Sequence, residues 1–191
     1  MVLRALLPFL LLAAAGPVYG CIVVGVPDGD TLTLFCDGEK RVIDLAEIDA
    51  PELRQDFGTR AQQSLSDMCL RRTARTEDER TTADGRIVAR VTCDDVSAGA
   101  EQLRRGMAWV SDEHAHDKTL YVAQNIARHS ERGLWSGEAP VAPWEWRRIA
   151  ATKAEVEAAA LTKRKAARQT APPPPEPDNP VKAFFKRLFG Q

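Results

Sequence analysis

Two short apolar runs on either side of a Pro-Asp-Gly turn constrain the fold of this chain more than any other feature. The runs are CIVVGV, residues 21–26, and TLTLFC, residues 31–36, and both contain β-branched residues. A turn of this composition between such runs predicts a β-hairpin. If residues 26 and 31 pair at the turn, residues 21 and 36 also pair, which brings Cys21 opposite Cys36 at a distance that suits a disulfide. The alternative is that the two cysteines are unrelated.

The cysteine pattern favours disulfides over a zinc site. The chain has four cysteines and no CxxC motif, and an even set of this kind is typical of exported proteins. With Cys21 and Cys36 matched, the remaining pair is Cys69 with Cys93.

The first twenty residues predict a secretory signal peptide. Arg4 precedes an apolar run over residues 5–15, and Gly16-Pro17 and small residues follow before position 21. The run is too short to span a bilayer. We therefore expect a secreted or periplasmic protein that begins at Cys21. Two alternatives are a tether that is never removed and a lipidated Cys21, which would leave one thiol unpaired.

Further short strands and helices follow the hairpin. The patterns predict strands over 41–48, 87–93 and 107–110, and helices over 58–70, 97–105 and 117–132, the last capped by Asp117. Short strands with helices between them favour a small β-barrel on which the helices pack.

Composition changes after the globular part, which we assign to residues 21–148. Residues 149–170 predict a charged, solvated helix, and residues 171–180 a proline-rich linker. Residues 181–191 form a basic amphipathic segment that we expect to contact a membrane surface or a protein. Its apolar positions are Val181, Phe184, Phe185, Leu188 and Phe189.

Charge is distributed unevenly along the chain. Residues 21–150 hold 17 Lys and Arg against 23 Asp and Glu, a net charge of −6, whereas residues 151–191 hold 8 against 4, a net charge of +4. An acidic globular part is a weak electrostatic footprint for general binding of nucleic acid.

Three carboxylates and one arginine are candidates for a catalytic site. Asp30 ends the hairpin turn, Asp49 ends a strand, and Glu52 follows across a proline. Two aspartates can bind a hard cation such as Ca²⁺, and a nearby glutamate can activate water. Arg86 can grip a phosphate oxygen. Together these groups suit phosphodiester hydrolysis, although acidic turns are more often only solvated.

The motifs VPDGDTLTL, IDAPE, DGRIVARV, RRGMAWV, GLWS and PWEWR, in this order, resemble the secreted thermonuclease family, the staphylococcal-nuclease-like proteins. The resemblance runs from about residue 23 to residue 147, and DGDT followed by IDAPE is its most specific part. It implies an α+β fold, an OB-type five-stranded β-barrel with about three packed helices. It also implies Ca²⁺-dependent cleavage of single-stranded DNA or RNA, by a protein that we expect to be a monomer.

The resemblance assigns roles to particular residues. The metal-binding aspartates of the family fall on Asp30 and Asp49, with a backbone carbonyl from Ala50. The family glutamate, which acts through water, falls on Glu52. One of the two catalytic arginines falls on Arg86.

The other family arginine falls on Asp44, which is the main departure from the pattern. Arg41 cannot replace it, because strand alternation points residue 41 to the opposite face. Arg54, in the loop after Glu52, is a candidate substitute. Glu47 is interpreted as a solvated strand residue.

Two other features have structural interpretations that we prefer. DEHAHD, residues 112–117, could bind a transition metal, but we expect a solvated loop. Trp135, Trp144 and Trp146 could stack on bases, but we expect them to close the barrel.

The sequence therefore favours an exported Ca²⁺-dependent nuclease that Asp44 impairs. The alternative is a non-catalytic OB-fold module of the cell envelope that binds nucleic acid or protein. The complete set of Asp30, Asp49, Glu52 and Arg86 favours the enzyme, and the acidic domain and Asp44 favour the alternative.

Overall fold

The computed structural model describes residues 20–111, 115–170 and 180–190. The signal peptide and the proline-rich linker that the sequence predicts therefore lie almost wholly outside the described residues. The chain divides into two compact units, Met1–Arg147 and Arg148–Gln191, which are described separately below.

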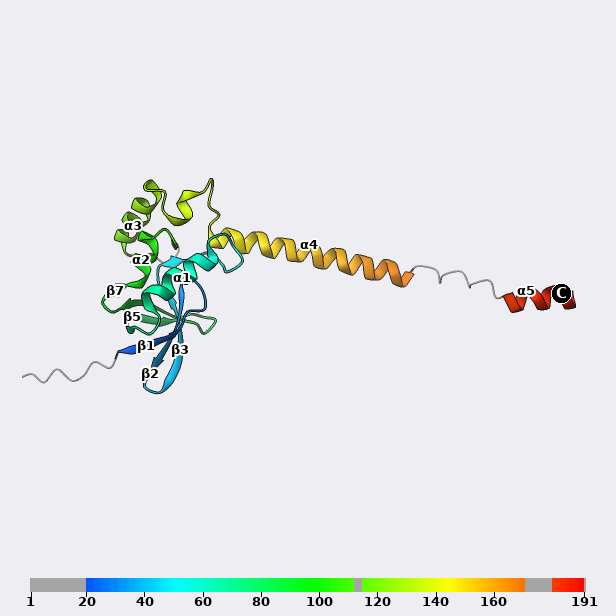
Figure 1. Ribbon diagram of the computed structural model, residues 1–191, viewed down its shortest axis with the longest axis horizontal. Coiled ribbons are helices and arrows are strands. Elements are labelled where there is room, and N and C mark those ends of the chain that lie inside the picture. The colour runs from blue at the N-terminus through cyan, green and yellow to red at the C-terminus, as the bar shows by residue number, and fades with distance from the viewer. Residues whose placement is uncertain (1–19, 112–114, 171–179, 191) are drawn as a thin grey trace, which may run out of the picture. The chain divides into compact units, whose positions relative to one another are not determined.

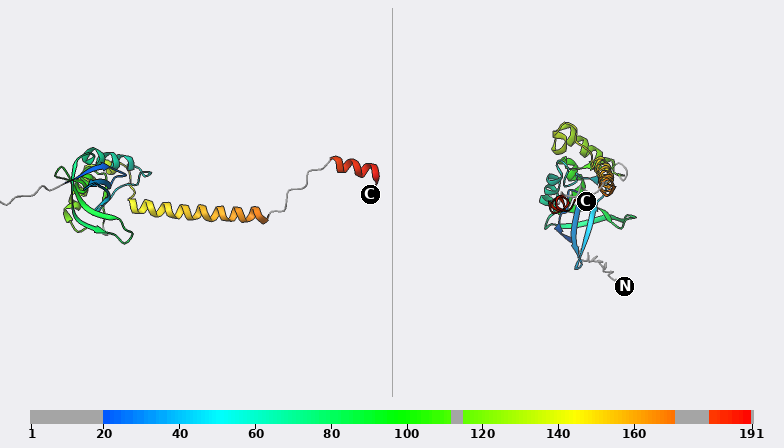
Figure 2. Two further views of the ribbon diagram at one scale, coloured as in Figure 1. Left: turned by 90° about the horizontal axis from the view of Figure 1, so that it is seen from below. Right: turned by 90° about the vertical axis from the view of Figure 1, so that its right-hand side faces the viewer.

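The first unit is built on a closed β-barrel (Figures 1 and 2). Within the described residues, five strands run in the order β3-β2-β1-β5-β6, and β6 pairs back onto β3 in parallel. These strands are β1 (Cys21–Gly25), β2 (Thr31–Cys36), β3 (Glu39–Leu45), β5 (Thr73–Thr81) and β6 (Ile87–Cys93). Beyond the barrel, β7 (Val96–Ser97) pairs with β6, and β4 (Ile48–Asp49) pairs with β8 (Trp109–Val110). The expected α+β fold, an OB-type barrel with packed helices, is confirmed.

The β1–β2 hairpin has the predicted register at its open end. Ile22 pairs with Phe35 and Val23 with Leu34, but the register shifts by one residue before Gly25, which pairs with Thr33. The predicted disulfides are both formed. Cys21 bridges Cys36 at the end of the hairpin, with a Cα–Cα distance of 4.6 Å. Cys69 bridges Cys93, which fastens α1 (Gly58–Cys69) to β6.

Two strand assignments differ from the sequence prediction. Strand β5, TARTEDERT, was not predicted, because most of its side chains are exposed and charged and give no alternating apolar pattern. It is held by pairing with β1 and β6. The strand expected over 41–48 ends at Leu45, because Glu47 adopts a positive φ of 66° and turns the chain into β4.

The three helices predicted over 58–70, 97–105 and 117–132 are formed. Helix α1 buries Ala61, Leu65 and Cys69. Ser97 caps α2 (Ala98–Arg104), and Asp117 caps α3 (Lys118–His129) by accepting from the Thr119 N–H. Helix α3 ends three residues earlier than expected, and the turn that follows leads into the short 3₁₀ helix η1 (Gly133–Ser136).

The core has a main part and a smaller one. The barrel is filled by aliphatic residues, among them Val23, Leu32, Leu34, Ile43 and Leu65. Trp109 and Trp135 form the centre of the smaller cluster, with their ring centroids 5.2 Å apart in an edge-to-face arrangement. Trp135 is therefore buried in this smaller cluster and not in the core of the barrel.

Helix α4 (Pro143–Thr170) begins in the first unit and continues into the second, which also contains α5 (Pro180–Phe189). All five apolar side chains named above for the C-terminal segment are exposed on α5. In the described part of the chain, no helix combines the length and apolarity needed to cross a bilayer.

Candidate active site

Asp30 is held against the end of β4 by a closely packed turn. Its Oδ2 accepts a hydrogen bond of 2.6 Å from the Ala50 N–H. A Cβ at Gly29 would lie 2.7 Å from the Cβ atoms of both Ala50 and Ala61, so only glycine allows this approach. The buried Gln102 amide donates to the carbonyls of Gly29 and Ala61, at 2.7 and 2.9 Å. The turn that carries Asp30 is therefore fixed from α1 and α2.

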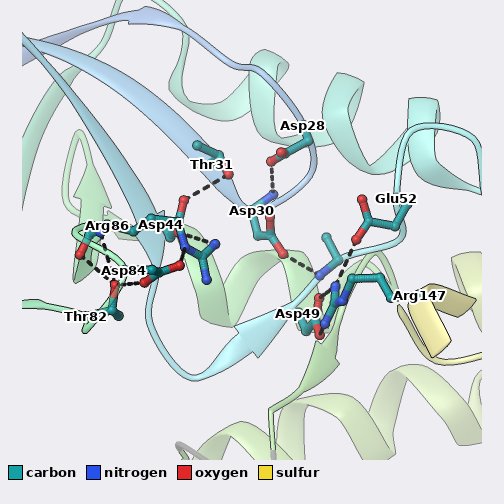
Figure 3. Close-up of polar contacts among 11 residues, drawn as sticks. Asp28, Asp30, Thr31, Asp44, Asp49, Glu52, Thr82, Asp84, Arg86 and Arg147 are labelled. Atoms are coloured by element: carbon teal, nitrogen blue, oxygen red, sulfur yellow. Dashed lines mark hydrogen bonds and ion pairs between the residues drawn. The ribbon is translucent and has the colours of Figure 1, made fainter. Parts of the chain in front are cut away.

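Asp49 and Glu52 share one guanidinium, that of Arg147 (Figure 3). Arg147 Nη2 lies 2.7 Å from Asp49 Oδ2, and Nη1 lies 3.1 Å from Asp49 Oδ1 and 2.9 Å from Glu52 Oε1. The hydrogen bonds to Asp49, and then those to Glu52, raise the pKa of Arg147 above its usual value. Arg147 is therefore a fixed positive charge on the two carboxylates.

A glutamine ties the Glu52 loop to the segment before α4. Gln55 is buried, and its Oε1 accepts from the Glu52 N–H at 3.3 Å. Its Nε2 donates to the Val141 carbonyl at 2.5 Å. This link brings the N-terminal end of α4, and with it Arg147, next to Glu52.

Arg86 is paired with the carboxylate that replaces the family arginine. Its Nη1 lies 2.8 Å from Asp44 Oδ2, and its Nε donates to Asp84 Oδ2 at 3.1 Å. The Thr31 hydroxyl donates to the other oxygen of Asp44 at 3.2 Å. Arg86 is thus neutralised by two carboxylates, although 65% of its side chain is exposed.

The candidate site residues line one cleft of about 730 Å³. Figure 3 shows the two paired arginines on opposite sides of Asp30. The cleft has six acidic and three basic lining residues, which gives a formal net charge of −3. They are Asp28, Asp30, Asp44, Glu47, Asp49 and Glu52, with Arg80, Arg86 and Arg147.

Asp30 is partly buried beside other acids. Removal from water raises the pKa of Asp30 well above its usual value, and the negative charges of Asp28 and Asp49 raise it further. The hydrogen bond from the Ala50 N–H acts in the opposite direction. A bound cation would relieve this accumulation of charge.

The donor set fits a hard cation that keeps part of its water shell. Carboxylate and carbonyl oxygens are the ligands that Ca²⁺ prefers. Across the described residues, no group of three or more His, Cys, Asp or Glu side chains is arranged to hold a metal ion. The Asp30 and Asp49 carboxylates line one cleft, so the residues present fit a hard cation of this kind.

The interpretation of Glu47 as a solvated residue was wrong. Only 6% of Glu47 is exposed, and its carboxylate accepts from the backbone N–H groups of His116 and Asp117, at 2.7 and 3.1 Å. The Nη1 atom of Arg90 lies 3.7 Å from Glu47 Oε2. The turn at Glu47 directs its side chain inward, where it anchors the segment before α3. The first three residues of the DEHAHD motif lie outside the described residues.

The suggestion that Arg54 takes the place of the missing family arginine was also wrong. Arg54 is exposed and does not line the cleft. Arg41 pairs with Glu79 at 2.6 Å, away from the cleft lining, as strand alternation predicts. The residue that sequence reasoning missed is Arg147. Its signal was the position of an arginine three residues after Trp144, on the same side of a helix.

The expectation that Trp144 helps to close the barrel was wrong. It is 43% exposed and lines the cleft, in contrast to the buried Trp135. The N-terminal end of α4 therefore brings an aromatic ring and a cation to the same cleft as Asp49 and Glu52.

Residues 42–137 of the chain match the protein-family model described as staphylococcal nuclease homologue. The chain belongs to the staphylococcal nuclease family. The matched segment includes Asp49, Glu52 and Arg86 but ends before α4 and Arg147. By this homology the chain is a phosphodiesterase of the nuclease class.

Relatives of the staphylococcal nuclease family resemble the chain over most of their lengths. A Haemophilus influenzae protein named "uncharacterized endonuclease" is 36% identical over 129 residues, 67% of this chain and 72% of the relative. Protein ParB of Escherichia coli is 34% identical over 160 residues, 76% of this chain and 90% of the relative. A micrococcal nuclease of Shigella flexneri is 33% identical over 137 residues, 66% and 79% of the two chains.

Proposed function

We propose that this protein is an exported, Ca²⁺-dependent nuclease that hydrolyses phosphodiester bonds in single-stranded DNA or RNA. The observation that carries the proposal is the convergence of Asp30, Asp49, Glu52 and Arg86 on one cleft. Family membership supports the reaction class. The residues proposed as metal ligands, base and cation come from different strands and loops and line the same cleft.

Each residue has a role that its chemistry allows. Asp30 and Asp49, with the Ala50 carbonyl, would hold Ca²⁺, which when bound stabilises negative charge on phosphate oxygens. Glu52 accepts a proton from the attacking water, and its exposed carboxylate is accessible for this. Arg86 donates to the oxygens of the phosphorane-like transition state.

Asp44 weakens the proposed reaction. It puts a negative charge where the family pattern has a positive one, and it pairs with Arg86 at 2.8 Å. A substrate phosphate must therefore compete with Asp44 and Asp84 for the same guanidinium. We expect slow cleavage for this reason.

The second candidate is a non-catalytic OB-fold module that binds nucleic acid or protein. The observation that favours it is the neutralised state of Arg86, together with the net negative charge of the cleft. In that case the cleft would bind Ca²⁺ and ligand without hydrolysis.

The experiment that separates these functions is cleavage of labelled single-stranded DNA and RNA by the purified protein in Ca²⁺. We expect wild type to cleave and Glu52→Gln to lose at least about a hundredfold in rate, since general base catalysis contributes about two to four powers of ten. Glu77→Gln, an exposed carboxylate of β5, is the matched control and should retain activity. Equal rates for wild type and Glu52→Gln would reject the proposed role of Glu52.

Export to an oxidising compartment is part of the same proposal. The Cys21–Cys36 and Cys69–Cys93 bridges support it, because such bridges persist mainly outside the cytoplasm. A Cys21 sulfur in a disulfide cannot also carry a thioether lipid. Mass spectrometry of the protein from exporting cells, without reduction, should find an N-terminus at Cys21 linked to Cys36. An acylated Cys21 would reject this processing.

A further inference from the structure

We infer that the N-terminal end of α4 is a substrate-binding element, in which Arg147 binds a phosphate of the nucleic-acid strand and Trp144 stacks on a base. This inference rests on the proposed function of the cleft. Arg147 would then provide, from α4, the positive charge that the family pattern has at position 44 in β3. Trp144 would also have a base-stacking role.

The position of Arg147 supports a role in phosphate binding. Its guanidinium lies in the cleft between Asp49 and Glu52, with three hydrogen bonds of 2.7 to 3.1 Å. Half of the side chain remains exposed, so the guanidinium can reach an incoming ligand without unfolding of α4. A planar guanidinium also binds phosphate through paired hydrogen bonds.

The same contacts make Arg147 a competitor of the metal ion. Asp49 and Glu52 cannot give the same oxygen atoms to Arg147 and to Ca²⁺ or a water molecule. Binding of a cation to Asp49 therefore weakens the hold on Arg147 and leaves its guanidinium available to a phosphate. A guanidinium released from Asp49 in this way can contact substrate.

Trp144 belongs to the same element. It precedes Arg147 by three residues, a spacing that brings two helical side chains to one side. It is 43% exposed and lines the cleft. A ring beside a phosphate-binding cation is the pairing by which proteins bind single strands without reading their sequence.

Other cations are less suited to this role. Arg86 is assigned to the transition state of the proposed reaction, and neither of its partners, Asp44 and Asp84, is a proposed Ca²⁺ ligand that a bound cation would draw away from it. Arg80 lines the cleft from β5 and is the main rival, so it enters the experiment as a comparison. Arg54 has the same charge, lies near Glu52 in sequence, and does not line the cleft, which makes it the matched control.

The experiment measures two affinities for each variant of the full mature protein. The first is the Kd of Ca²⁺ without nucleic acid, by calorimetry. The second is the Kd of a short single-stranded phosphorothioate oligodeoxynucleotide with saturating Ca²⁺, by fluorescence anisotropy. The variants are Arg147→Gln, Arg80→Gln, Arg54→Gln and Trp144→Ala.

Arg147→Gln should move the two affinities in opposite directions. Ca²⁺ should bind about two- to fivefold more tightly, the range for loss of an exposed ion pair. The oligonucleotide should bind about tenfold more weakly, as expected for loss of a charged hydrogen bond to phosphate. Trp144→Ala should weaken only oligonucleotide binding, also by about tenfold. Arg54→Gln should change neither value.

Weaker Ca²⁺ binding by Arg147→Gln would mean that Arg147 only supports the structure, and would overturn the inference. Unchanged oligonucleotide affinity, or a loss found in Arg80→Gln instead, would overturn it as well. Wild type that binds no Ca²⁺ would reject both this inference and the proposed function. Wild type that binds both ligands as described but cleaves nothing would reject the proposed function alone.

Discussion

At the scale of single residues, Asp44 is expected to slow the proposed reaction. It pairs with Arg86, so it removes one cation from the site and occupies another. Loss of one aligned cation typically costs about 3 kcal/mol, or two to three powers of ten in rate. We expect Asp44→Arg to raise the cleavage rate of single-stranded DNA at least about tenfold, measured under single-turnover conditions in Ca²⁺.

Two further variants test the cause of that gain. Asp44→Asn removes the anion without adding a cation, so its rate should lie between those of wild type and Asp44→Arg. Glu52→Gln in the Asp44→Arg background should abolish the gain, since the cation helps only if water is activated. An Asp44→Arg protein that binds Ca²⁺ but shows no cleavage would support the non-catalytic module. An unchanged, measurable rate would mean that another cation, Arg147 first, already serves.

Asp30 gives the site a defined pH dependence. Burial raises the pKa of Asp30, so between its usual value near 3.8 and the folded value the native protein holds a proton that the unfolded chain releases. Without Ca²⁺, the Asp30 contribution to stability is therefore lost as pH rises through the folded pKa. Ca²⁺ must displace that proton, so its affinity should increase with pH over this interval. Calorimetry in two buffers of different ionisation enthalpy should detect the released proton, and a pH-independent affinity would contradict this account.

Four of the site residues proposed from the sequence lie together in one cleft, and the groups that contact them were missed. Asp30, Asp49, Glu52 and Arg86 carry recognisable motifs, and all four line the cleft. Glu47 was misassigned because its inward direction depends on a positive φ, which residue type alone does not reveal. Arg147 was missed because its contacts cross 95 and 98 positions in the chain. Its spacing from Trp144, the one local signal, does not reveal which carboxylates it contacts.

At the scale of elements, the two disulfides should stabilise the barrel by similar amounts. Cys21–Cys36 closes a separation of 15 residues at the end of the β1–β2 hairpin, and Cys69–Cys93 closes one of 24 between α1 and β6. Chain entropy gives about 3 kcal/mol for each, and slightly more for the longer loop. Urea unfolding of the double serine variant of each pair should show that loss, and a loss well below 1 kcal/mol for either pair would contradict it.

Helix α5 should bind anionic membranes weakly and reversibly. Its described apolar side chains are exposed, and Phe185 stacks on Phe189 with 5.9 Å between ring centroids. Its three basic residues each add about 1 kcal/mol near anionic lipid. The intact protein should co-sediment with phosphatidylglycerol vesicles more than a form truncated after Pro180, and high salt should reduce the difference. Equal sedimentation of the two forms would reject membrane contact.

The helices and strands that could be predicted from the sequence are those with a regular hydrophobic pattern. The hairpin, β6 and α1 have apolar residues at strand or helix spacing, and each was predicted close to its observed bounds. Strand β5 has only Ala74 fully buried, so its pairing partners define it. Its existence follows from closure of the barrel, which is a property of the whole fold.

At the scale of the whole molecule, an acidic cleft has to bind a substrate that is also negatively charged. The cleft has a formal net charge of −3, from six acidic and three basic lining residues. Such a surface repels a polyanion unless a divalent cation is bound. Ca²⁺ should therefore control both binding of the strand and its cleavage.

The rate of single-stranded DNA cleavage as a function of free Ca²⁺ tests this account most directly. The mature protein is stripped with chelator and Ca²⁺ is then restored in steps, alongside Asp49→Asn, which lacks one proposed ligand charge. We expect no cleavage in chelator, slow cleavage that saturates with Ca²⁺, and a higher Ca²⁺ requirement for Asp49→Asn. Cleavage that persists in chelator, or that is absent at every Ca²⁺ concentration, would contradict the account.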